Sequence, residues 1–507
     1  MNGTTRNRLA AGLAAVCLGG VAIAAETAPS PPPASMIDRF EGHPRAFIMS
    51  DIGNEPDDQM SLVRLLLYSN EIDIAGLVAT TSTWQRTVVR PDMMREIIDQ
   101  YAKVQPNLML HAKGWPSAAD LAARVAPGQT GYGMAATGPD KESAGADLLI
   151  RAVDTPDPRP VWVCLWGGAN TLAQALIEVR RTRTPDELAR FVSRIRVYSI
   201  SDQDDAGAWI RREFPSLLYV VTPSTQSGDE YYYATWTGIS GDGYYRNGLG
   251  ADGASVTNDW LESNIRSKGP LGAHYPRFMF IMEGDTPSYL GLIGNGLESF
   301  RNPSWGGWGG RYIYRTPHGE TRPIWTQGGD LFTRFTSQDT VTAKSGAHIV
   351  SDQATIWRWR TAFQNDFAAR MDWTIRPFRS ANHAPEVVIN GLSGHGVIDM
   401  TQPLGQPLTL DASRSTDPDG NKLTYRWFVY EEAGASSGQL AEIRLDRADG
   451  ARAVVTPIAA CRAAWLGQPN CQGNGEAHLI LAVTDNGTPA LTAYRRIIIH
   501  TRAAPGS

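Results

Sequence analysis

From residue 45 to about residue 378, short apolar runs alternate with segments whose apolar positions recur every three or four residues. The runs that predict buried strands are residues 46–49, 72–80, 161–165, 195–200, 217–221 and 278–282. The amphipathic segments that predict helices include residues 91–103, which begin with a proline, and 170–180. Strands that alternate with helices favour an α/β fold with a mostly parallel sheet covered on both faces.

The pattern changes after Ala384. Residues 385–501 show short alternating runs separated by turn sequences such as Asp485-Asn486-Gly487, and helical periodicity is nearly absent. This is typical of an all-β, immunoglobulin-like sandwich. We therefore predict an α/β domain at 45–382 and a sandwich at 383–503.

The N-terminus has the pattern of a targeting segment. Arg6 and Arg8 precede an apolar run that ends in the small residues Ala22-Ile23-Ala24, and a proline-rich stretch follows. The run is too short for a typical membrane span. We predict a signal peptide at 1–24, a linker at 25–44, no stable membrane anchor, and a secreted or periplasmic protein.

Composition narrows the partners. The chain has 507 residues and a formal net charge of −5, without a long basic run, so nucleic acid is not an expected partner. Cys164 lies in an apolar run and is predicted to be a buried free thiol, whereas Cys461 and Cys471 are candidates for a disulfide. Nothing in the composition decides whether the protein forms a homo-oligomer.

Four acids follow the first predicted strand within eight residues: Asp51, Glu55, Asp57 and Asp58. The carboxyl ends of strands in open α/β sheets are where ligands bind. Such crowded carboxylates repel one another unless a cation lies among them, and Ca²⁺ takes ~6–8 oxygen ligands. The simpler alternative is that Asp57 and Asp58 only complement the dipole of the helix that begins there.

Three more polar patches follow predicted strands. They are residues 166–171, 201–205 and 283–288. Each alone could be a turn that caps a helix, but together they lie at one edge of the predicted sheet. A fourth acidic turn, 417–420 in the sandwich, is most simply a turn, with a second calcium site as the alternative.

These motifs resemble the calcium-dependent nucleoside hydrolases. Residues 51–58 (DIGNEPDD) are similar to that family's first acidic loop, DxDPGxDD, and residues 165–176 (LWGGANTLAQAL) are similar to its Gly-Gly helix start. The resemblance covers most of residues 45–300. The details EPDDQ, GYG and GDTPS, with the C-terminal sandwich, look closer to a secreted bacterial branch described as cellulose-binding and nucleoside hydrolase-like.

The resemblance implies metal ligation by Asp58, Asp285 and the backbone carbonyl of Trp166, with Ca²⁺ as the cofactor. It also implies that Asp57 binds sugar hydroxyls. The full set of residues expected to contact substrate is Asn54, Asp57, Thr83, Trp84, Asn170, Asp202 and Asp204.

One departure concerns catalysis. The Asp that in the family ligates calcium and orients or deprotonates the attacking water aligns with Gly53 here. Asp51 or Glu55 could take that role, and both are the expected catalytic residues; alternatively the site has lost hydrolysis and kept binding. The histidine that the family often places near the leaving base is not evident. Tyrosines and tryptophans around residues 231–245, with Trp84, are candidates for stacking on sugars or bases.

The resemblance implies a hydrolase that cleaves an N- or O-glycosidic bond to a furanose with water activated by calcium. Export, the appended sandwich and the abundant aromatic residues favour a glycan or glycoside over a free nucleoside. The alternative from a different class is a non-catalytic protein that binds carbohydrate, such as cellulose, and uses its acids only to hold calcium.

Overall fold

The structure is a computed structural model of the whole chain. It describes residues 38, 40, 42–224, 229–240, 251–330, 335–343, 345–435, 440–459 and 474–502. The predicted signal peptide, the tyrosines at 244 and 245, and Cys461 and Cys471 lie outside the described residues.

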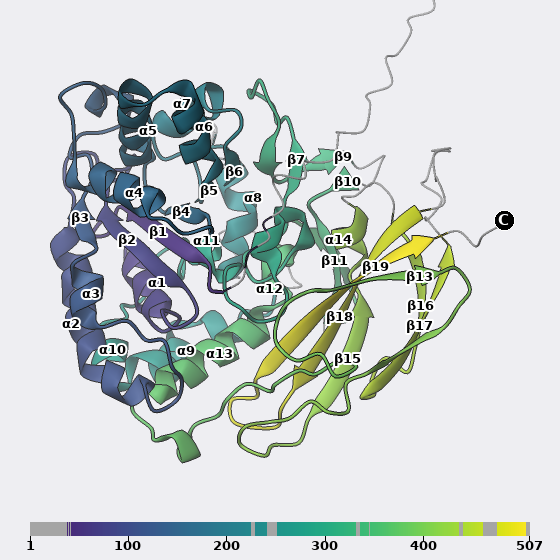
Figure 1. Cartoon of the computed structure of the whole chain (residues 1–507). Helices are drawn as coiled ribbons and strands as arrows, with labels where there is room; N and C mark the ends of the chain where they lie inside the picture. Colours follow the sequence, from purple (N-terminus) through teal and green to yellow (C-terminus); the bar gives the residue numbers. More distant parts are fainter. Residues whose placement is uncertain are drawn as a thin grey trace, which may run out of the picture. The chain divides into compact units, whose positions relative to one another are not determined.

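An eight-stranded sheet forms the first part of the chain (Figure 1). Its order is β3-β2-β1-β4-β5-β6-β8-β7, in which β7 is antiparallel to β8 and the other pairs are parallel. The strands are β1 (Arg45–Ser50), β2 (Asp73–Ala79), β3 (Val125–Pro127), β4 (Val161–Leu165), β5 (Ile195–Ser199), β6 (Leu218–Val221), β7 (Ile313–Arg315) and β8 (Ile324–Thr326).

The helices of this part are α1 (Asp57–Leu66), α2 (Pro91–Leu108), α3 (Ala118–Ala122), α4 (Ala144–Asp154), α5 (Asn170–Thr182), α6 (Pro185–Ser193), α7 (Ala206–Glu213), α8 (Asp229–Tyr233), α9 (Asn258–Leu261), α10 (Gly269–Ala273), α11 (Pro287–Leu290), α12 (Ala354–Trp357) and α13 (Arg360–Trp373). Short 3₁₀ or π turns are η2 (Met134–Ala136), η3 (Thr235–Ile239), η4 (Ala254–Val256), η5 (Glu262–Arg266), η6 (Ser299–Arg301), η7 (Pro303–Trp305) and η8 (Phe378–Ser380). Two small hairpins pair β9 (Gly329–Asp330) with β10 (Phe335–Thr336) and β11 (Asp339–Thr342) with β12 (His348–Ser351).

Strand β1 lies in the middle of the sheet and is buried along its whole length. Ala46 and Ile48 belong to an apolar core shared with α1 and α2, whereas Phe47 and Met49 belong to a second core shared with α4 and α5. Alternate side chains of one strand therefore enter different cores, because successive residues of a strand point to opposite faces. The predicted parallel sheet with helices on both faces is confirmed, and Cys164 is a buried free thiol as predicted.

The strand predicted at 278–282 is wrong. These residues have no regular structure, and the run divides into exposed Met279 and Phe280 and buried Ile281 and Met282. The place beside β6 is taken instead by β8, which no pattern in the sequence predicted. The turn that carries Asp285 therefore follows an irregular segment rather than a strand.

The C-terminal part contains two sheets with the orders β13-β19-β18-β15 and β14-β17-β16. The strands are β13 (Ile398–Pro403), β14 (Leu408–Asp411), β15 (Thr424–Val429), β16 (Glu442–Asp446), β17 (Arg452–Ala459), β18 (Asn474–Thr484) and β19 (Thr492–Arg502), and one short helix is α14 (Glu431–Ala435). Trp427, Leu481 and Val455 share one apolar core, so the predicted sandwich is confirmed.

The predicted boundary between the two domains stays a prediction. Tyr430 and Tyr494, from the sandwich strands and their loops, belong to the same apolar core as Trp359. In the turn at 417–420, one Asp417 carboxylate oxygen accepts backbone hydrogen bonds from Asp419 (2.9 Å) and Asn421 (2.9 Å), as in an ordinary turn. Within the described ranges, no helix combines the length and the apolar character that a membrane span needs.

Candidate functional site

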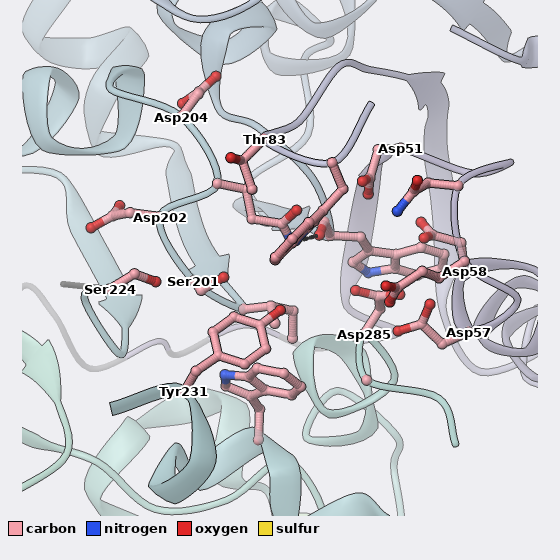
Figure 2. A pocket seen from close by; sticks show the side chains of 18 of the residues that line it. Asp51, Asp57, Asp58, Thr83, Ser201, Asp202, Asp204, Ser224, Tyr231 and Asp285 are labelled. Atoms are coloured by element: carbon pink, nitrogen blue, oxygen red, sulfur yellow. Dashed lines mark hydrogen bonds between the residues drawn. The ribbon is translucent and has the colours of Figure 1, made fainter. Parts of the chain in front are cut away.

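A cavity of about 940 Å³ lies at the carboxyl ends of β1, β4, β5 and β6. Its walls come from the loops that follow these strands, from α8 and η3, and from residues 280–285. The acids Asp51, Asp57, Asp58 and Asp285 lie together at one side of the view in Figure 2. The cavity is therefore where the topology of a parallel sheet favours a ligand site.

The acid cluster, which we define as Asp51, Glu55, Asp57, Asp58 and Asp285, gathers residues from two distant parts of the chain. One carboxylate oxygen from each of Asp57, Asp58 and Asp285 lies within 4.8 Å of the others. Ser50 donates a hydrogen bond to Asp58 Oδ1. Asp285 Oδ2 is buried and has no hydrogen-bond partner among the residues that the structure describes.

Electrostatics in the acid cluster are unfavourable for charge. Burial, which is the largest cause, raises the pKa of Asp51 to about 6 and that of Asp57 to about 7. Burial and then the charges of the neighbouring acids raise the pKa values of Asp58 and Asp285 well above the usual range. The pKa of Glu55 is raised by burial as well. Because one carboxylate's charge raises the pKa of the next, these acids act as one electrostatic unit.

Two interactions connect α1 with the segment that carries Asp285. Helix α1, which carries Asp57 and Asp58, also carries Arg64, whose guanidinium lies 2.6 Å from the carboxylate of Glu283. Thr286, next to Asp285, donates a hydrogen bond of 3.0 Å to the Ser61 hydroxyl. Glu283 itself has a left-handed backbone (φ 56°), a conformation that ordinary residues adopt only when their surroundings hold them there.

The acid cluster fits a hard cation. Its ligands are carboxylate oxygens, the donor type that Ca²⁺ and Mg²⁺ prefer, and the free Asp285 oxygen is unexplained without a further partner. A bound cation would also reverse the repulsion that raises the pKa values. Asp57, Asp58 and Asp285 can therefore hold a metal ion.

Trp166 lies beside the acid cluster, where the resemblance places it. Its carbonyl accepts a hydrogen bond from the Gln203 side chain, and its indole N–H donates to Ser288 Oγ at 2.8 Å. Ser288 in turn donates to the Asp285 carbonyl at 2.7 Å. Trp166 thus connects the loop after β4 to the turn that holds Asp285, and its carbonyl keeps a second lone pair for a ligand.

The backbone at Gly53 disfavours an acidic side chain at that position. Its φ is +106°, and a Cβ built there would lie 3.1 Å from atoms of Arg90 and Met93. A side chain at this position would be strained and would begin against α2 and the residue before it. Without an acid at position 53, Asp51 and Glu55 are the remaining acids of the cluster beside the ligand set Asp57, Asp58 and Asp285.

Most residues expected to contact substrate line the same cavity. They are Asn54, Asp57, Thr83, Trp84, Asp202 and Asp204. Two of them are already paired: Asp202 accepts two hydrogen bonds from Arg211 (2.8 and 2.9 Å), and Asp204 accepts from the backbone N–H groups of Asn170 and Ala206. Burial, the largest cause, raises the pKa of Asp204 to about 6.

Asn170 is not among the described residues that line the cavity. Its buried side chain donates to Thr81 Oγ1 (3.2 Å) and to the carbonyl of Gly131 (2.8 Å). Asn170 thus links the loop after β2 to the glycine-rich loop that contains Gly131, while its buried side-chain oxygen has no hydrogen-bond partner among the described residues. Its expected contact with substrate stays a prediction.

The aromatic candidates divide into two groups. Tyr231 and Trp236 line the cavity and contact each other edge to face, with ring centroids 4.8 Å apart. Trp308, in contrast, is buried in the core, and Trp305 packs against His478 of the sandwich. His274 is exposed, and its Nδ1 atom lies 3.2 Å from the carbonyl oxygen of Pro270. It is not among the residues that line the cavity. Among the described lining residues there is no histidine.

Several lining residues lie outside the patches that the sequence pointed to: Tyr132, Ile200, Ala208, Ser224, Phe280 and Ile281. The rule that ligands bind at carboxyl ends of strands could have found Ser224, which follows β6, as it found the patch at 201–205 after β5. Tyr132 lies in a glycine-rich loop whose path no local pattern predicts.

Comparison with known proteins agrees with this architecture. Residues 45–312 match the family model described as "Cellulose-binding Sde182, nucleoside hydrolase-like domain". Residues 407–501 match "Cellulose-binding protein Sde0182, C-terminal domain". The chain belongs to this family. Both parts of its fold, the α/β sheet and the β-sandwich, are thereby accounted for.

A solved structure is similar to almost the whole chain. A nucleoside hydrolase-related hypothetical protein from Saccharophagus degradans, described as associated with carbohydrate metabolism, is 34% identical, with a TM-score of 0.74 over 91% of this chain and 100% of that chain. The effector protein XOO4466 is 13% identical over 57% of this chain and 89% of that chain, with a TM-score of 0.28, which is too low to show a shared fold. No curated protein matches the chain.

Proposed function

We propose that this protein is a secreted or periplasmic glycosidase that depends on calcium and hydrolyses an N- or O-glycosidic bond to a furanose in a carbohydrate. The observation that carries the proposal is the acid cluster: three carboxylates within 4.8 Å, with a free buried oxygen, open into a cavity. The family's nucleoside hydrolase-like domain supports hydrolysis, and its description as cellulose-binding supports a carbohydrate ligand.

Asp57, Asp58 and Asp285 would hold the ion, with the Trp166 carbonyl as a further ligand. Calcium bound there would supply the positive charge that keeps these acids ionised and makes a nearby water more acidic. Asp51, whose pKa is about 6, is mostly charged at neutral pH and can accept a proton from the attacking water. Glu55 is the second candidate for that role, because it lies close enough for its charge to raise the pKa of Asp51.

The second candidate function is carbohydrate binding without catalysis. Gly53 favours it, because glycine stands where the hydrolases keep an acid and its positive φ would strain any side chain there. The cavity also offers no histidine among its described lining residues to protonate a leaving group. In this case the acid cluster would hold calcium only to fix sugar hydroxyls.

Purified protein would be incubated with ribosides, arabinofuranosides, cello-oligosaccharides and nucleosides, with calcium or with a chelator. Sugar release that requires calcium and is lost in Asp285→Asn supports the glycosidase. The matched control is Asp147→Asn, an exposed acid on α4, which should change nothing. Tight retention of a carbohydrate without release supports the binding protein, and release that is unaffected by chelator excludes the metal-dependent mechanism.

A further inference from the structure

The cavity has a second polar end, which we call the far end and define as Ser201, Asp202, Gln203, Asp204 and Ser224. These residues follow β5 and β6, whereas the acid cluster follows β1 and the irregular segment before Asp285. In Figure 2, Ser201, Asp202 and Ser224 lie on the opposite side of the view from Asp57, Asp58 and Asp285, with Tyr231 between the two groups. Gln203 lies nearest the acid cluster, because its amide nitrogen donates to the Trp166 carbonyl. A ligand that fills the cavity must therefore satisfy polar groups at both ends.

Two buried atoms at the far end have no partner. Ser201 Oγ and Gln203 Oε1 make no hydrogen bond within the described residues, although their residues are only 3% and 7% exposed. The orientation of the Gln203 amide is fixed, because its nitrogen donates to the Trp166 carbonyl. Unpartnered buried polar atoms are rare in folded proteins, so a hydroxyl and an amide oxygen that line a cavity indicate a ligand that hydrogen-bonds to both.

Both acids at the far end already have partners within the chain. Asp202 forms a two-point ion pair with Arg211, and Arg211 also contacts Glu320 at 2.5 Å. Asp204 accepts the backbone N–H groups at the start of α5 and α7. The far end therefore has no need of a second cation, and its free groups are a neutral hydroxyl and a neutral amide oxygen. Such groups suit the hydroxyls of a neutral sugar.

The space agrees with two sugar rings. A volume of about 940 Å³ lies near the top of the ~300–1,000 Å³ range of small-molecule pockets, so one ring at the acid cluster leaves the far end unfilled. Tyr231 and Trp236 line the cavity and offer an apolar surface on which a ring can stack. No described lining residue is a histidine or lysine placed to protonate a nucleobase.

We propose that the far end binds a sugar as the leaving group, so that the substrate is a disaccharide or longer oligosaccharide rather than a nucleoside. This inference rests on the proposed glycosidase function and names its substrate class. Hydrolysis then breaks the bond between the anomeric carbon and the bridging oxygen. The oxygen of water joins the anomeric carbon, one water proton goes to the bridging oxygen, and two free sugars result.

The test measures binding and hydrolysis separately on the full chain with calcium. Titration calorimetry would use cellobiose and α-1,5-arabinobiose as disaccharides, arabinose as a monosaccharide, and inosine and uridine as nucleosides. We expect Ser201→Ala to weaken disaccharide binding about 5- to 10-fold, the loss of one neutral hydrogen bond, with arabinose and calcium binding unchanged. The matched control is Ser69→Ala, whose buried hydroxyl bonds to the Leu66 carbonyl away from the cavity.

The outcomes separate this inference from the proposed function. Disaccharide binding that needs Ser201, without sugar release from any probe, contradicts hydrolysis and leaves the far-end sugar site standing. Sugar release from nucleosides only, or disaccharide binding that is unchanged in Ser201→Ala, overturns the far-end inference. If Ser201→Ala does not fold, Ser201→Cys replaces the hydroxyl by a somewhat larger thiol that hydrogen-bonds only weakly, and answers the same question.

Discussion

Two groups of buried acids in this molecule meet opposite conditions. Asp339, at the start of β11, contacts Arg311 (2.8 Å) and Arg358 (2.7 Å) and accepts a hydrogen bond from Tyr430 (2.6 Å). Although burial alone would raise its pKa, these two cations and the hydrogen bonds lower it. In the acid cluster, Asp58 and Asp285 are also buried but face other acids, and their pKa values are raised.

The contrast separates a structural acid from a ligand site. A buried charge without a partner is strongly unfavourable, so a fold keeps one only where a partner arrives from outside. The ion pairs of Asp339 are complete within the chain. Those of the acid cluster are not, although Arg64 lies on the same helix as Asp58 and pairs instead with Glu283. The missing charge is therefore expected to come from a cation.

The largest effect is expected from Asp58→Asn. The change removes one of three carboxylate ligands, and calcium affinity should fall by more than the ~10–100-fold that loss of a supporting residue costs. In chelator, however, the variant should be as stable as the wild type or more stable, because a neutral amide replaces an uncompensated charge. Calorimetric titration with calcium and thermal melting in chelator measure the two effects. Equal calcium affinity in both proteins would contradict the site.

Asp339→Asn should give the reverse pattern. Without its carboxylate, Arg311 and Arg358 lose the acid that pairs with both of them in the interior, and breaking a buried ion pair costs about 3–5 kcal/mol. Calcium affinity of the folded variant should not change. Urea unfolding with and without calcium checks both statements. If Asp339→Asn lost calcium binding but not stability, Asp339 would belong to the metal site, and the contrast between Asp339 and the acid cluster would be wrong.

The pH dependence gives the next effect. Because the folded pKa values of Asp51 (about 6) and Asp57 (about 7) lie above their unfolded values, these groups stabilise the metal-free fold below about pH 4. That contribution is lost as pH rises through 6 to 7, on the order of 3 kcal/mol for Asp51 alone. Calcium binds the charged forms and offsets the loss.

The rise in melting temperature caused by calcium should therefore be small near pH 5 and large near pH 8. Thermal melting with calcium and with chelator at both pH values measures it. The Asp58→Asn variant serves as the control and should show little calcium effect at either pH. An equal calcium effect at both pH values in the wild type would mean that the acids are charged without the ion.

Much of the fold follows from local patterns. Buried strands such as 161–165 carry continuous apolar runs, and their sequence alone predicts a parallel sheet. The run at 278–282 misled because apolar residues at a cavity mouth look like those of a buried strand: Phe280 is half exposed and lines the cavity. Conversely, β8 has only three residues, which are too few to show a periodic pattern.

Only part of the candidate site could be predicted from the sequence, again because local patterns do not show which distant residues meet. Asp57 and Asp58 are neighbours in sequence, but Asp285 lies more than 200 residues further along the chain. The pattern only placed Asp285 in a polar patch, and its role as a metal ligand came from the resemblance. The unpartnered state of Ser201 and Gln203 depends on contacts that no sequence pattern contains. Asn170 follows β4, and the hydrogen bond from its side chain to the Gly131 carbonyl is likewise a contact that no sequence pattern contains.

The smallest effect is expected at Trp84, which lines the cavity mouth and is 59% exposed. It carries no charge and supports no buried partner, so Trp84→Ala should change stability by less than about 0.5 kcal/mol and leave calcium affinity intact. Loss of an aromatic surface for stacking should weaken binding of an oligosaccharide about 2- to 10-fold. The matched control is Met109→Ala, an equally exposed apolar residue after α2. If Trp84→Ala instead lowered calcium affinity, the cavity mouth and the acid cluster would be coupled, and the acid cluster could not be treated as a self-contained ion site.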